Sequence, residues 1–314
     1  MRSQAAPGAL AGRLRLLPMP LKRAIHPVRG MPFSWAFNPY RGCAHACVYC
    51  YARRTHEYLG YNSAEDFERI ILVKYDAPER LRVELADPAW RREVVAVGTA
   101  TDPYQPVEGR LRLTRRSLAA FLEYNSPVCL VTKSTLILRD RDLLAELCQQ
   151  APQTTVWVTI TTLDRTLARA LEPGTPPPRQ RLRAVRELAA AGVRVGVLVA
   201  PVLPGLTDQE PHLRRLVQAA AEAGACELHA NSLRLCEGAW EVYRGWLFRH
   251  FPELRRLYAR LFTPFSAYPA RSYRERIERR VGAFKEEAGF SESRDEARVA
   301  AAPASVTEQL TFAW

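Results

Sequence analysis

Long hydrophobic runs are absent from this sequence of 314 residues. No stretch approaches the roughly 18 consecutive apolar residues of a membrane-spanning helix, and the longest apolar run, residues 196–203, has the length of a strand. The N-terminus lacks a compact apolar core before a small-residue cleavage site, which argues against a secretory signal. An Arg-rich start without acids is also typical of organelle transit peptides, so that alternative stays open. We expect a soluble protein with no membrane segment.

Cysteines are too few for a disulfide scaffold. The chain has seven, an odd number and a low density for its length. Four of them are scattered, mostly within apolar stretches, as is typical of buried free thiols: Cys129, Cys148, Cys226 and Cys236. This usage predicts a reduced, cytoplasmic setting.

Acidic residues are absent from residues 1–56, which contain nine Lys and Arg. The net charge of the whole chain is +12, so nine of the twelve excess positive charges lie in its first fifth. Clustered cations bind a polyanion through counterion release. A solvated basic arm explains the same pattern equally well. Charge alone therefore leaves both interpretations open.

After residue 30, strand and helix patterns alternate. Apolar, β-branched runs predict strands at 33–37, 94–97, 128–132, 155–160, 193–199 and 227–233, and one outside the main sheet at 70–73. Helical periodicity occupies residues 111–124, 180–191 and 208–223. About six parallel β/α units between residues 33 and 265 predict an α/β protein, either an open partial barrel or a doubly wound sheet. Both architectures place the chemistry at the carboxyl ends of the strands.

Three regions are expected along the chain. Residues 1–32, rich in Ala, Gly, Pro and Arg, form a basic, partly ordered arm, and residues 33–265 form the β/α domain. Residues 266–314 form a C-terminal helix and a flexible tail: 266–290 are predicted as a charged surface helix and 291–308 have a disordered composition. The apolar end, QLTFAW, either folds back on the core of the chain or docks on a partner.

The motif that carries the chemistry is CAHACVYC, in which Cys43, Cys47 and Cys50 are spaced C-x3-C-x2-C. Three thiolates this close in sequence converge from a single loop and suit an iron–sulfur cluster or zinc. Zinc needs a fourth ligand, for which His45 and His56 are candidates, and no second cysteine or histidine hook is evident. A [4Fe–4S] cluster held by three cysteines keeps one iron open for a substrate or cofactor. The spacing favours the cluster.

This motif, with Tyr49 directly before its third cysteine, resembles the signature loop of the radical S-adenosylmethionine (SAM) superfamily. The resemblance implies a partial (β/α)6 barrel in which SAM binds the open iron of the [4Fe–4S] cluster. It also implies that SAM is cleaved reductively to a 5′-deoxyadenosyl radical, and that an electron donor of the flavodoxin or ferredoxin type acts as a partner. The cofactors supply the hard chemistry, and the protein orients them.

The same resemblance predicts contacts with SAM after three successive strands. Thr99, Thr101 and Asp102 stand where the family holds the methionyl amino group, and Asp102 is a suitable acceptor for an ammonium. Two further sets follow the next strands: Lys133 and Ser134 for the methionyl carboxylate, and Thr159, Thr161 and Thr162 for the ribose. Each residue also has a plain structural explanation, as a turn former or a strand former.

Three further stretches resemble the spore photoproduct lyase-related branch of the superfamily: TDPYQPVE, LEPGTPPPRQRL and GVLVAPVLPGLTD. The resemblance covers about residues 33–250. The lyase splits a thymine-dimer lesion in DNA and uses a cysteine near its second strand as hydrogen donor. The corresponding region here, residues 98–102, contains no cysteine, so the resemblance does not extend to that reaction. Cys236 is the candidate to replace it in space, with a buried structural thiol as the alternative.

Aromatic and cationic residues are interleaved around the motif: Phe33, Trp35, Phe37, Tyr40, Arg41, Tyr49, Tyr51, Arg53, Arg54, Tyr58 and Tyr61. Aromatic faces and cations together are typical of a nucleic-acid channel, and rings that pack the barrel mouth are the alternative.

Three hypotheses about function follow from the sequence as a whole. The chain is a radical SAM enzyme acting on nucleic acid, a radical SAM enzyme acting on a protein or small metabolite, or a non-catalytic module that binds zinc or nucleic acid.

Overall fold

The strands form two sheets in the computed structural model, which describes residues 14–31, 33–263 and 266–290. The predicted disordered tail and the QLTFAW end lie outside these residues. The large sheet has the order β10-β9-β8-β7-β6-β3-β2, and the small sheet has the order β1-β5-β4. Their bounds are β1 Arg15–Pro18, β2 Ile25–Pro27, β3 Trp35–Phe37, β4 Tyr40–Arg41, β5 Ile70–Val73, β6 Val95–Val97, β7 Val128–Thr132, β8 Thr155–Thr159, β9 Val195–Val202 and β10 Glu227–Ser232.

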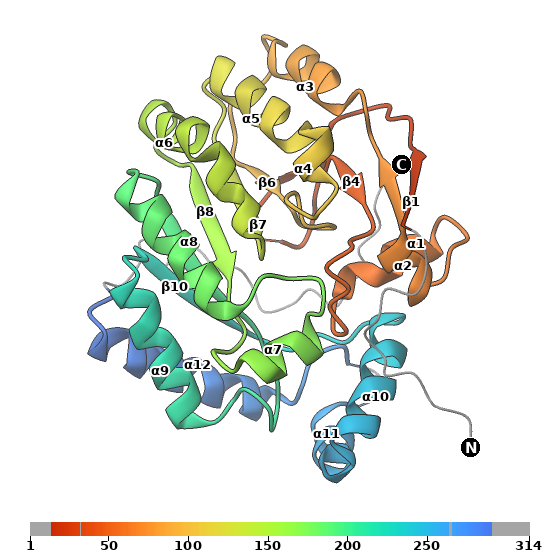
Figure 1. The fold of residues 1–314 in the computed structure, drawn as a ribbon, viewed down its shortest axis with the longest axis vertical. Helices are drawn as coiled ribbons and strands as arrows, with labels where there is room; N and C mark the ends of the chain where they lie inside the picture. The colour runs from red at the N-terminus through yellow and green to blue at the C-terminus, as the bar shows by residue number, and fades with distance from the viewer. Residues whose placement is uncertain (1–13, 32, 264–265, 291–314) are drawn as a thin grey trace.

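The strand order of the large sheet decides between the two predicted architectures. From β3 to β10, each strand pairs in parallel with the next large-sheet strand along the chain. A doubly wound sheet needs a point at which this order reverses, and right-handed crossovers without a reversal place every helix on one face. The sheet is therefore singly wound, and Figure 1 shows α5, α6, α8 and α9 around its outside. The predicted six-unit partial barrel and its six strands are confirmed.

The helices that cover the barrel follow their strands in order. In the described residues they are α1 Arg54–Glu57, α2 Glu65–Arg69, α3 Ala77–Leu85, α4 Glu108–Leu111, α5 Leu113–Glu123, α6 Arg141–Gln150, α7 Arg165–Leu171, α8 Pro178–Ala190, α9 Glu210–Glu222, α10 Ala239–His250, α11 Arg255–Leu261 and α12 Arg271–Glu287, with short 3-10 turns η1 Tyr51–Arg53, η2 Thr135–Asp140 and η3 Pro252–Leu254. None of them is both long and apolar enough to cross a bilayer.

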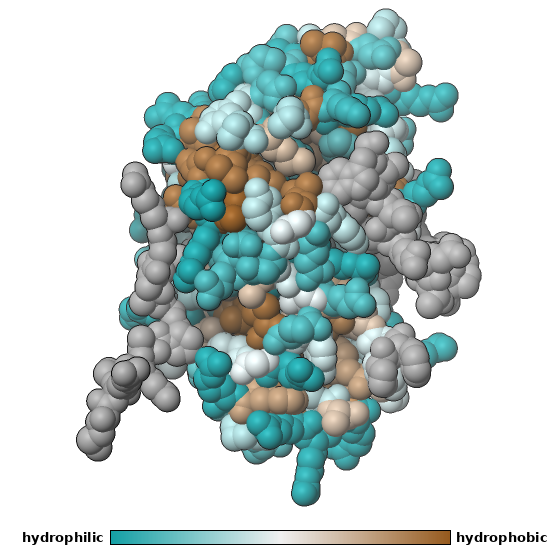
Figure 2. Space-filling model, turned by 90° about the vertical axis from the view of Figure 1, so that its right-hand side faces the viewer, coloured by the Kyte–Doolittle hydropathy of each residue, from teal (hydrophilic) through white to brown (hydrophobic). Residues whose placement is uncertain are grey.

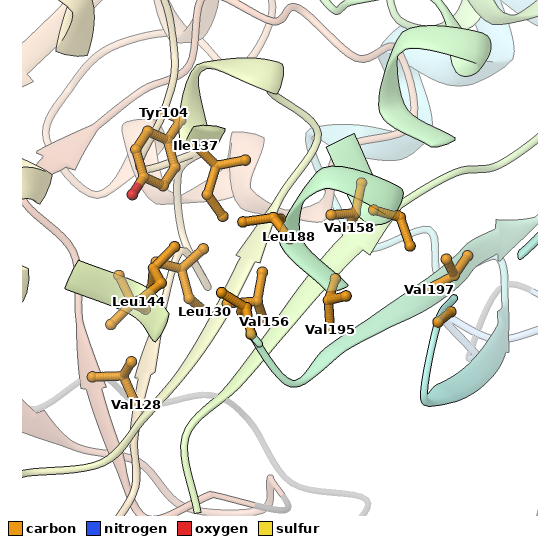
Figure 3. Packing of buried hydrophobic residues seen from close by; sticks show 14 of the residues in the cluster. Tyr104, Val128, Leu130, Ile137, Leu144, Val156, Val158, Leu188, Val195 and Val197 are labelled. Atoms are coloured by element: carbon orange, nitrogen blue, oxygen red, sulfur yellow. The ribbon is translucent and has the colours of Figure 1, made fainter. Parts of the chain in front are cut away.

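The core lies between the sheet and these helices. Alternate strand residues such as Val156, Val158 and Val197 are fully buried and face Leu188 of α8 and its neighbours (Figure 3). Each buried aliphatic side chain stabilises the fold by about 1.5–3 kcal/mol relative to an exposed one. This alternation fixes which strand residues face the helices and which face the inside of the barrel.

The segment predicted as a basic arm contributes to both sheets. Strand β1 adds in parallel to β5, and β2 adds antiparallel to β3 at the edge of the barrel. The carboxylate of Glu84 accepts hydrogen bonds from the backbone amides of Ala24 and Ile25, both at 2.8 Å, and so fixes the arm to α3. As predicted, residues 70–73 form a strand outside the main sheet.

Helix α12 has a more central place than its charged sequence suggests. Its buried face consists of Tyr273, Ile277, Val281 and Phe284, which belong to the main core cluster and pack beside α9 and β10. The sequence predicted a charged surface helix, and the structure shows that its apolar stripe covers the last strand of the barrel. Figure 2 shows a face of the molecule that is mostly hydrophilic, with hydrophobic patches between the polar side chains.

Candidate functional site

The three motif cysteines lie on one loop, which follows β3 and β4 at the carboxyl end of the barrel. Cys43 and Cys47 are each 7% exposed, and Cys50 is half-buried; all three are free thiols. The amide of Ala46 donates to the carbonyl of Cys43 at 3.2 Å, and the amide of Cys50 donates to the carbonyl of Cys47 at 3.3 Å. These bonds make the loop a compact turn that carries three thiols.

The loop is not arranged around a single metal ion. In the described part of the chain, no three His, Cys, Asp or Glu side chains surround a point that one ion can occupy. A structural zinc site requires four ligands that converge on one ion. A four-iron cluster does not, since each thiolate binds a separate iron. The donor set, three thiols from one turn, fits an iron–sulfur cluster.

The loop after β6 holds the start of the cysteine loop. The hydroxyl of Thr101 donates to the carbonyl of Gly42 at 2.6 Å, and the side-chain amide of Gln105 donates to the same oxygen at 3.1 Å. The Gln105 carbonyl accepts from the amide of Ala44 at 3.1 Å. Gly42 has a φ of +82°, and a Cβ there would lie 2.6 Å from the carbonyl of Ile70, so only glycine fits. The sequence analysis did not identify Gln105.

The turn after α7 supports the other side of the cysteine loop. The amide of Gly174 donates to the carbonyl of His45 at 3.0 Å, and the amide of Val48 donates to the carbonyl of Leu171 at 3.0 Å. A Cβ at position 174 would lie 2.3 Å from the carbonyl oxygen of Ala44. The close approach of the two backbones therefore requires glycine at this position.

Arg53 also belongs to the support of this loop. Its guanidinium is fully buried and donates to the carbonyl of Cys47 at 2.8 and 3.0 Å, and to the carbonyls of Ser63 and Ala64 at 3.0 Å. It also pairs with Glu68. The prediction of Arg53 as one of the cations of a nucleic-acid channel was wrong, because a side chain committed inside the protein cannot reach a phosphate.

Asp102 links the loop after β6 to the end of β7. One carboxylate oxygen accepts from the amide of Tyr104 at 2.8 Å and from the hydroxyl of Thr132 at 2.7 Å. The other accepts from the amide of Lys133 at 2.7 Å and lies 3.2 Å from Nδ1 of His45. Burial acts to raise the pKa of Asp102, but His45 and these donors outweigh it and lower the pKa to about 2. The contact of Asp102 with the amino group of SAM stays a prediction.

The other predicted polar residues lie at the same end of the barrel and have protein partners. Thr99 accepts a hydrogen bond from Asn38 at 3.1 Å, and Ser134 caps η2 by accepting from the amide of Leu136 at 3.2 Å. Thr162 accepts from the amide of Asp164 at 3.1 Å. The structure therefore brings these residues to the predicted edge of the sheet, and their roles toward SAM stay predictions.

A buried ion pair that the sequence analysis missed lies beneath Tyr49. Glu172 and Arg181 are each 1% exposed and form a direct ion pair. Glu172 also accepts from the hydroxyls of Tyr49 and Thr161, the latter at 3.0 Å, and Arg181 donates to the carbonyl of Thr159 at 3.1 Å. Burial acts to raise the pKa of Glu172, but the positive charges of Arg181 and Lys133 outweigh it and hold this pKa below its ordinary value. The network joins Tyr49, the residue before Cys50, to strand β8.

Lys133 lies close to the cysteine loop. Its ammonium is 5.8 Å from the centre of the Tyr49 ring, within the range of a cation–π contact. Burial, the largest single influence, acts to lower the pKa of Lys133, but the charges of Cys47 and Glu172 outweigh it and raise this pKa. Lys133 therefore stays positively charged beside the thiols, as a residue that binds an anionic group must.

When no metal is bound, burial disfavours the charged form of two of the thiols. Burial, the largest influence, raises the pKa of Cys47 to about 12 and that of Cys43 well above its ordinary value. Iron binds the thiolate and lowers the pKa of a thiol that it coordinates. Two buried thiols and one half-buried thiol, close to a cation, thus fit an iron–sulfur cluster.

Two other features border the site. An open hollow of about 640 Å3 is lined by His45, Ser134, Gly174 and their neighbours, and by none of the three cysteines. Cys236, which follows β10, has its sulfur 3.5 Å from the carbonyl oxygen of Tyr51 in η1. This thiol therefore lies at the barrel mouth beside the cysteine loop, and its role as a hydrogen donor stays a prediction.

Comparison with protein families identifies the fold and the motif together. The model of the radical SAM superfamily matches residues 37–217, more than half of the chain and the whole of the cysteine loop. The chain belongs to the radical SAM superfamily. Radical SAM proteins are enzymes that use SAM and an iron–sulfur cluster and need an external reductant, so this chain is a radical SAM enzyme.

Curated relatives extend over most of the chain. An uncharacterized protein of Mycobacterium tuberculosis is 43% identical over 251 residues, which cover 80% of this chain and 73% of the relative. An uncharacterized protein of Acidianus two-tailed virus is 29% identical, over 64% of this chain and 67% of the relative. An uncharacterized protein of Methanocaldococcus jannaschii is 26% identical, over 63% and 71%.

Solved structures share the radical SAM fold of this chain. Spore photoproduct lyase complexed with dinucleoside spore photoproduct superposes with a TM-score of 0.62 and 19% sequence identity, covering 87% of this chain and 79% of the lyase chain. A mutant of the lyase with bound SAM and the same ligand gives the same TM-score at 18% identity and the same coverage. At this identity the likeness concerns the fold.

Proposed function

We propose that this radical SAM enzyme holds a [4Fe–4S] cluster on Cys43, Cys47 and Cys50 and cleaves SAM reductively. The observation that carries the proposal is the cysteine loop: three free thiols on one turn, at the carboxyl end of the barrel, fixed from two sides. When bound, the cluster and SAM supply an electron and a 5′-deoxyadenosyl radical for the reaction. An electron donor of the flavodoxin or ferredoxin type would reduce the cluster.

The residues of the chain position and shield these cofactors. In this proposal Lys133 and Ser134 hold the methionyl carboxylate, because Lys133 is a half-buried cation that lies beside the Tyr49 ring and forms no ion pair in the described residues. The methionyl amino group faces the part of the site formed by Asp102, Thr99 and Thr101. Thr159, Thr161 and Thr162 serve the ribose, and the Glu172–Arg181 pair keeps Thr159, Thr161 and Tyr49 in place.

We further propose nucleic acid as the substrate class. Besides the acid-free start of the chain, the described surface carries cations on aromatic faces: Arg54 lies 5.6 Å from the Tyr58 ring centre, and Arg234 and Arg274 lie 5.5 and 5.6 Å from the Tyr268 ring centre. Tyr58 and Tyr268 are exposed. Arg234 lies two residues before Cys236 in the sequence. Such pairs suit stacking on bases and contact with phosphates. The dinucleoside lesion bound by spore photoproduct lyase agrees with this class.

The chemistry is tested by anaerobic reconstitution with iron and sulfide, followed by addition of SAM and a strong reductant. The proposal expects about four iron and four sulfide per chain and the formation of 5′-deoxyadenosine. One zinc without labile sulfide would show a non-catalytic module instead.

The substrate class is tested by binding of single-stranded and duplex nucleic acid at several salt concentrations. The proposal expects affinity to fall linearly with the logarithm of salt concentration, and expects Arg54→Ala to lower the slope by up to about 1 if Arg54 contacts a phosphate. Arg183→Ala, on the exposed face of α8, is the matched control. A slope near zero would favour a protein or small metabolite as substrate.

A further inference from the structure

Five arginines on helices α10 and α11 have no carboxylate partner in the part of the chain that the structure describes. Residues 239–262 contain these five cations and only two acids. All five are exposed: Arg244, Arg249, Arg255, Arg256 and Arg260. On α8 and α9, by contrast, exposed arginines pair with glutamates, as Arg214 does with Glu210 and Glu287. The surface of α10 and α11 therefore carries positive charge that no described acid neutralises by direct pairing.

One face of these two helices combines the arginines with aromatic rings. Trp240, Arg244 and Phe248 follow one another at intervals of four along α10, so they lie on the same side of the helix. The guanidinium of Arg244 is 6.0 Å from the centre of the Trp240 ring. The guanidinium of Arg255, the first residue of α11, is 4.9 Å from the centre of the Phe248 ring. These four residues are called the α10–α11 face.

The rings and the charges of this face remain accessible. Trp240 and Phe248 are only half-buried, so part of each ring reaches the surface. The one acid of α10, Glu241, does not pair with Arg244, because its carboxylate accepts a hydrogen bond from the amide of Gly238 at 2.7 Å and caps the helix. The α10–α11 face thus offers cations and ring surface together.

The buried side of the same helices packs against the cysteine loop. Tyr243 and Leu247 of α10 and Tyr258 of α11 belong to one core cluster with Cys47 and Tyr49. The hydroxyls of Tyr243 and Tyr258 are hydrogen-bonded to each other at 2.6 Å, which links the two helices. Figure 1 shows α10 and α11 together at one side of the barrel, below α1 and α2. A ligand on the α10–α11 face would therefore be held by elements that are fixed to the cysteine loop.

The start of α10 lies against the segment that follows the cysteine loop. A Cβ at Gly238 would lie 2.7 Å from a carboxylate oxygen of Glu57, at the end of α1. Next to it, Arg54 pairs with Glu237 at 3.7 Å and lies over the Tyr58 ring. The α10–α11 face and the Arg54–Tyr58 pair thus border the same region of the barrel mouth.

Guanidinium groups on aromatic rings suit a single nucleic-acid strand. Arginine supplies charge for the phosphates and a planar surface on which an unstacked base can lie, and the rings add further stacking surface. An acidic protein would match the charge alone, whereas a nucleic-acid strand matches both the charge and the rings.

We propose that the α10–α11 face binds a single strand of the nucleic-acid substrate and holds it beside the barrel mouth. The proposal rests on nucleic acid as the proposed substrate class and names the surface that binds it.

The test measures binding of a labelled single-stranded oligonucleotide to the full-length, reconstituted protein at several salt concentrations. The double variant Arg244→Gln/Arg255→Gln should lower the slope of log affinity against log salt by about 1.4, since each phosphate contact with a single strand contributes about 0.7. The matched control, Arg183→Gln/Arg186→Gln, removes the same charge from the exposed side of α8 and should keep the slope of wild type.

Phe248→Leu separates stacking from charge. It removes a ring and no charge, so affinity should fall by on the order of 10-fold while the salt slope stays that of wild type. Far-UV circular dichroism checks that the variant is folded. Unchanged affinity of the folded variant would overturn the assignment to a stacked nucleic-acid strand.

Two further results would overturn the α10–α11 face as the binding surface. One is a wild-type salt slope in the arginine double variant. The other is unchanged oligonucleotide binding in that variant together with lost reduction of the cluster by a flavodoxin-type donor, which would assign the face to the electron donor.

Failure of the proposed function gives different results. If wild type itself binds no oligonucleotide, the proposed substrate class fails together with the α10–α11 face. If wild type binds and the arginine variant binds equally, only the face fails. Formation of 5′-deoxyadenosine by wild type with a strong chemical reductant is measured separately, and its absence would remove the radical SAM function while leaving the binding result standing.

Discussion

Lys133 and Lys74 each follow a strand directly, β7 and β5, yet their surroundings are opposite in charge. Around Lys133, Cys47 and Glu172 outweigh the effect of burial and raise its pKa. Around Lys74, burial and Arg41 act together and lower its pKa to about 8. The cysteine-loop region therefore balances the charge of its lysine within the protein, whereas near Lys74 the charge of Asp76 does not outweigh burial and Arg41. Substitutions in the cysteine-loop region should break this balance, and they are taken in order from the largest expected effect to the smallest.

The largest expected effect is that of removing a ligand from the cysteine loop. Cys47→Ala should abolish cluster absorbance and 5′-deoxyadenosine formation, while far-UV circular dichroism shows a folded barrel, because the loop is held by backbone hydrogen bonds as well as by its thiols. Cys226→Ala, at an exposed thiol, is the control and should keep both signals. A Cys47→Ala protein that retains a full cluster would remove Cys47 from the ligand set.

Next in size is the loss of the buried ion pair. Arg181→Met leaves Glu172 buried without its partner and should lower the free energy of unfolding by about 3–5 kcal/mol in urea denaturation. Arg183→Met, which breaks an exposed pair with Glu187 on the same helix, should change it by less than about 1 kcal/mol. Equal losses in both variants would show that the buried pair does not support the site.

Replacement of Lys133 removes the cation beside the thiols. Lys133→Met should weaken SAM binding by about 10- to 100-fold, the loss of one charge-assisted hydrogen bond, and should retain cluster absorbance. Equilibrium binding of SAM to the reconstituted protein measures this change. Unchanged affinity would refute the assigned role, and so would loss of the cluster. Lys22→Met, at an exposed lysine, is expected to bind SAM as wild type does.

The smallest effect depends on pH and concerns Asp102. Its pKa is about 2 in the folded protein against an ordinary value of 3.8, so its contribution to stability is present above pH 4 and is lost as pH falls toward 2. The stability difference between wild type and Asp102→Asn should therefore shrink by about 1 kcal/mol between pH 5 and pH 3. Urea denaturation at the two pH values measures it. A difference that does not change with pH would mean that the carboxylate is not held in its charged form.

Much of the fold was readable from the sequence because strands covered by helices on one face and lining the barrel on the other produce runs of apolar and β-branched residues, as in residues 128–132 and 155–160. The singly wound order was not readable, since periodicity carries no information on strand neighbours. Strands β1 and β2 lie in a segment rich in Ala, Pro and Arg; β1 pairs with β5, more than fifty residues away, and the start of β2 is held by Glu84, sixty residues from Ala24. Tertiary contacts of this kind leave no local pattern.

In the site too, residues that are close together in sequence were predicted, and residues that only the fold brings together were missed. The cysteine spacing predicted the three thiols of the loop as metal ligands because these residues are close together in sequence. Arg181 is one of several arginines at the start of α8, and only the fold shows that it turns inward to Glu172. Gln105 and Gly174 act through backbone contacts with the cysteine loop, which depend on how two distant loops approach each other. The motif LEPGTPPPRQRL was a partial signal, since a Glu-Pro-Gly turn at the end of an apolar helix is an unusual place for a solvated acid.

The measurement that tests the central claim most directly is the yield of 5′-deoxyadenosine from SAM under anaerobic, reducing conditions, with reconstituted wild type and Cys47→Ala protein compared side by side. The account predicts that wild type forms 5′-deoxyadenosine in proportion to its cluster content and that the variant forms none above background. A wild-type protein with a complete [4Fe–4S] cluster that leaves SAM intact would contradict it.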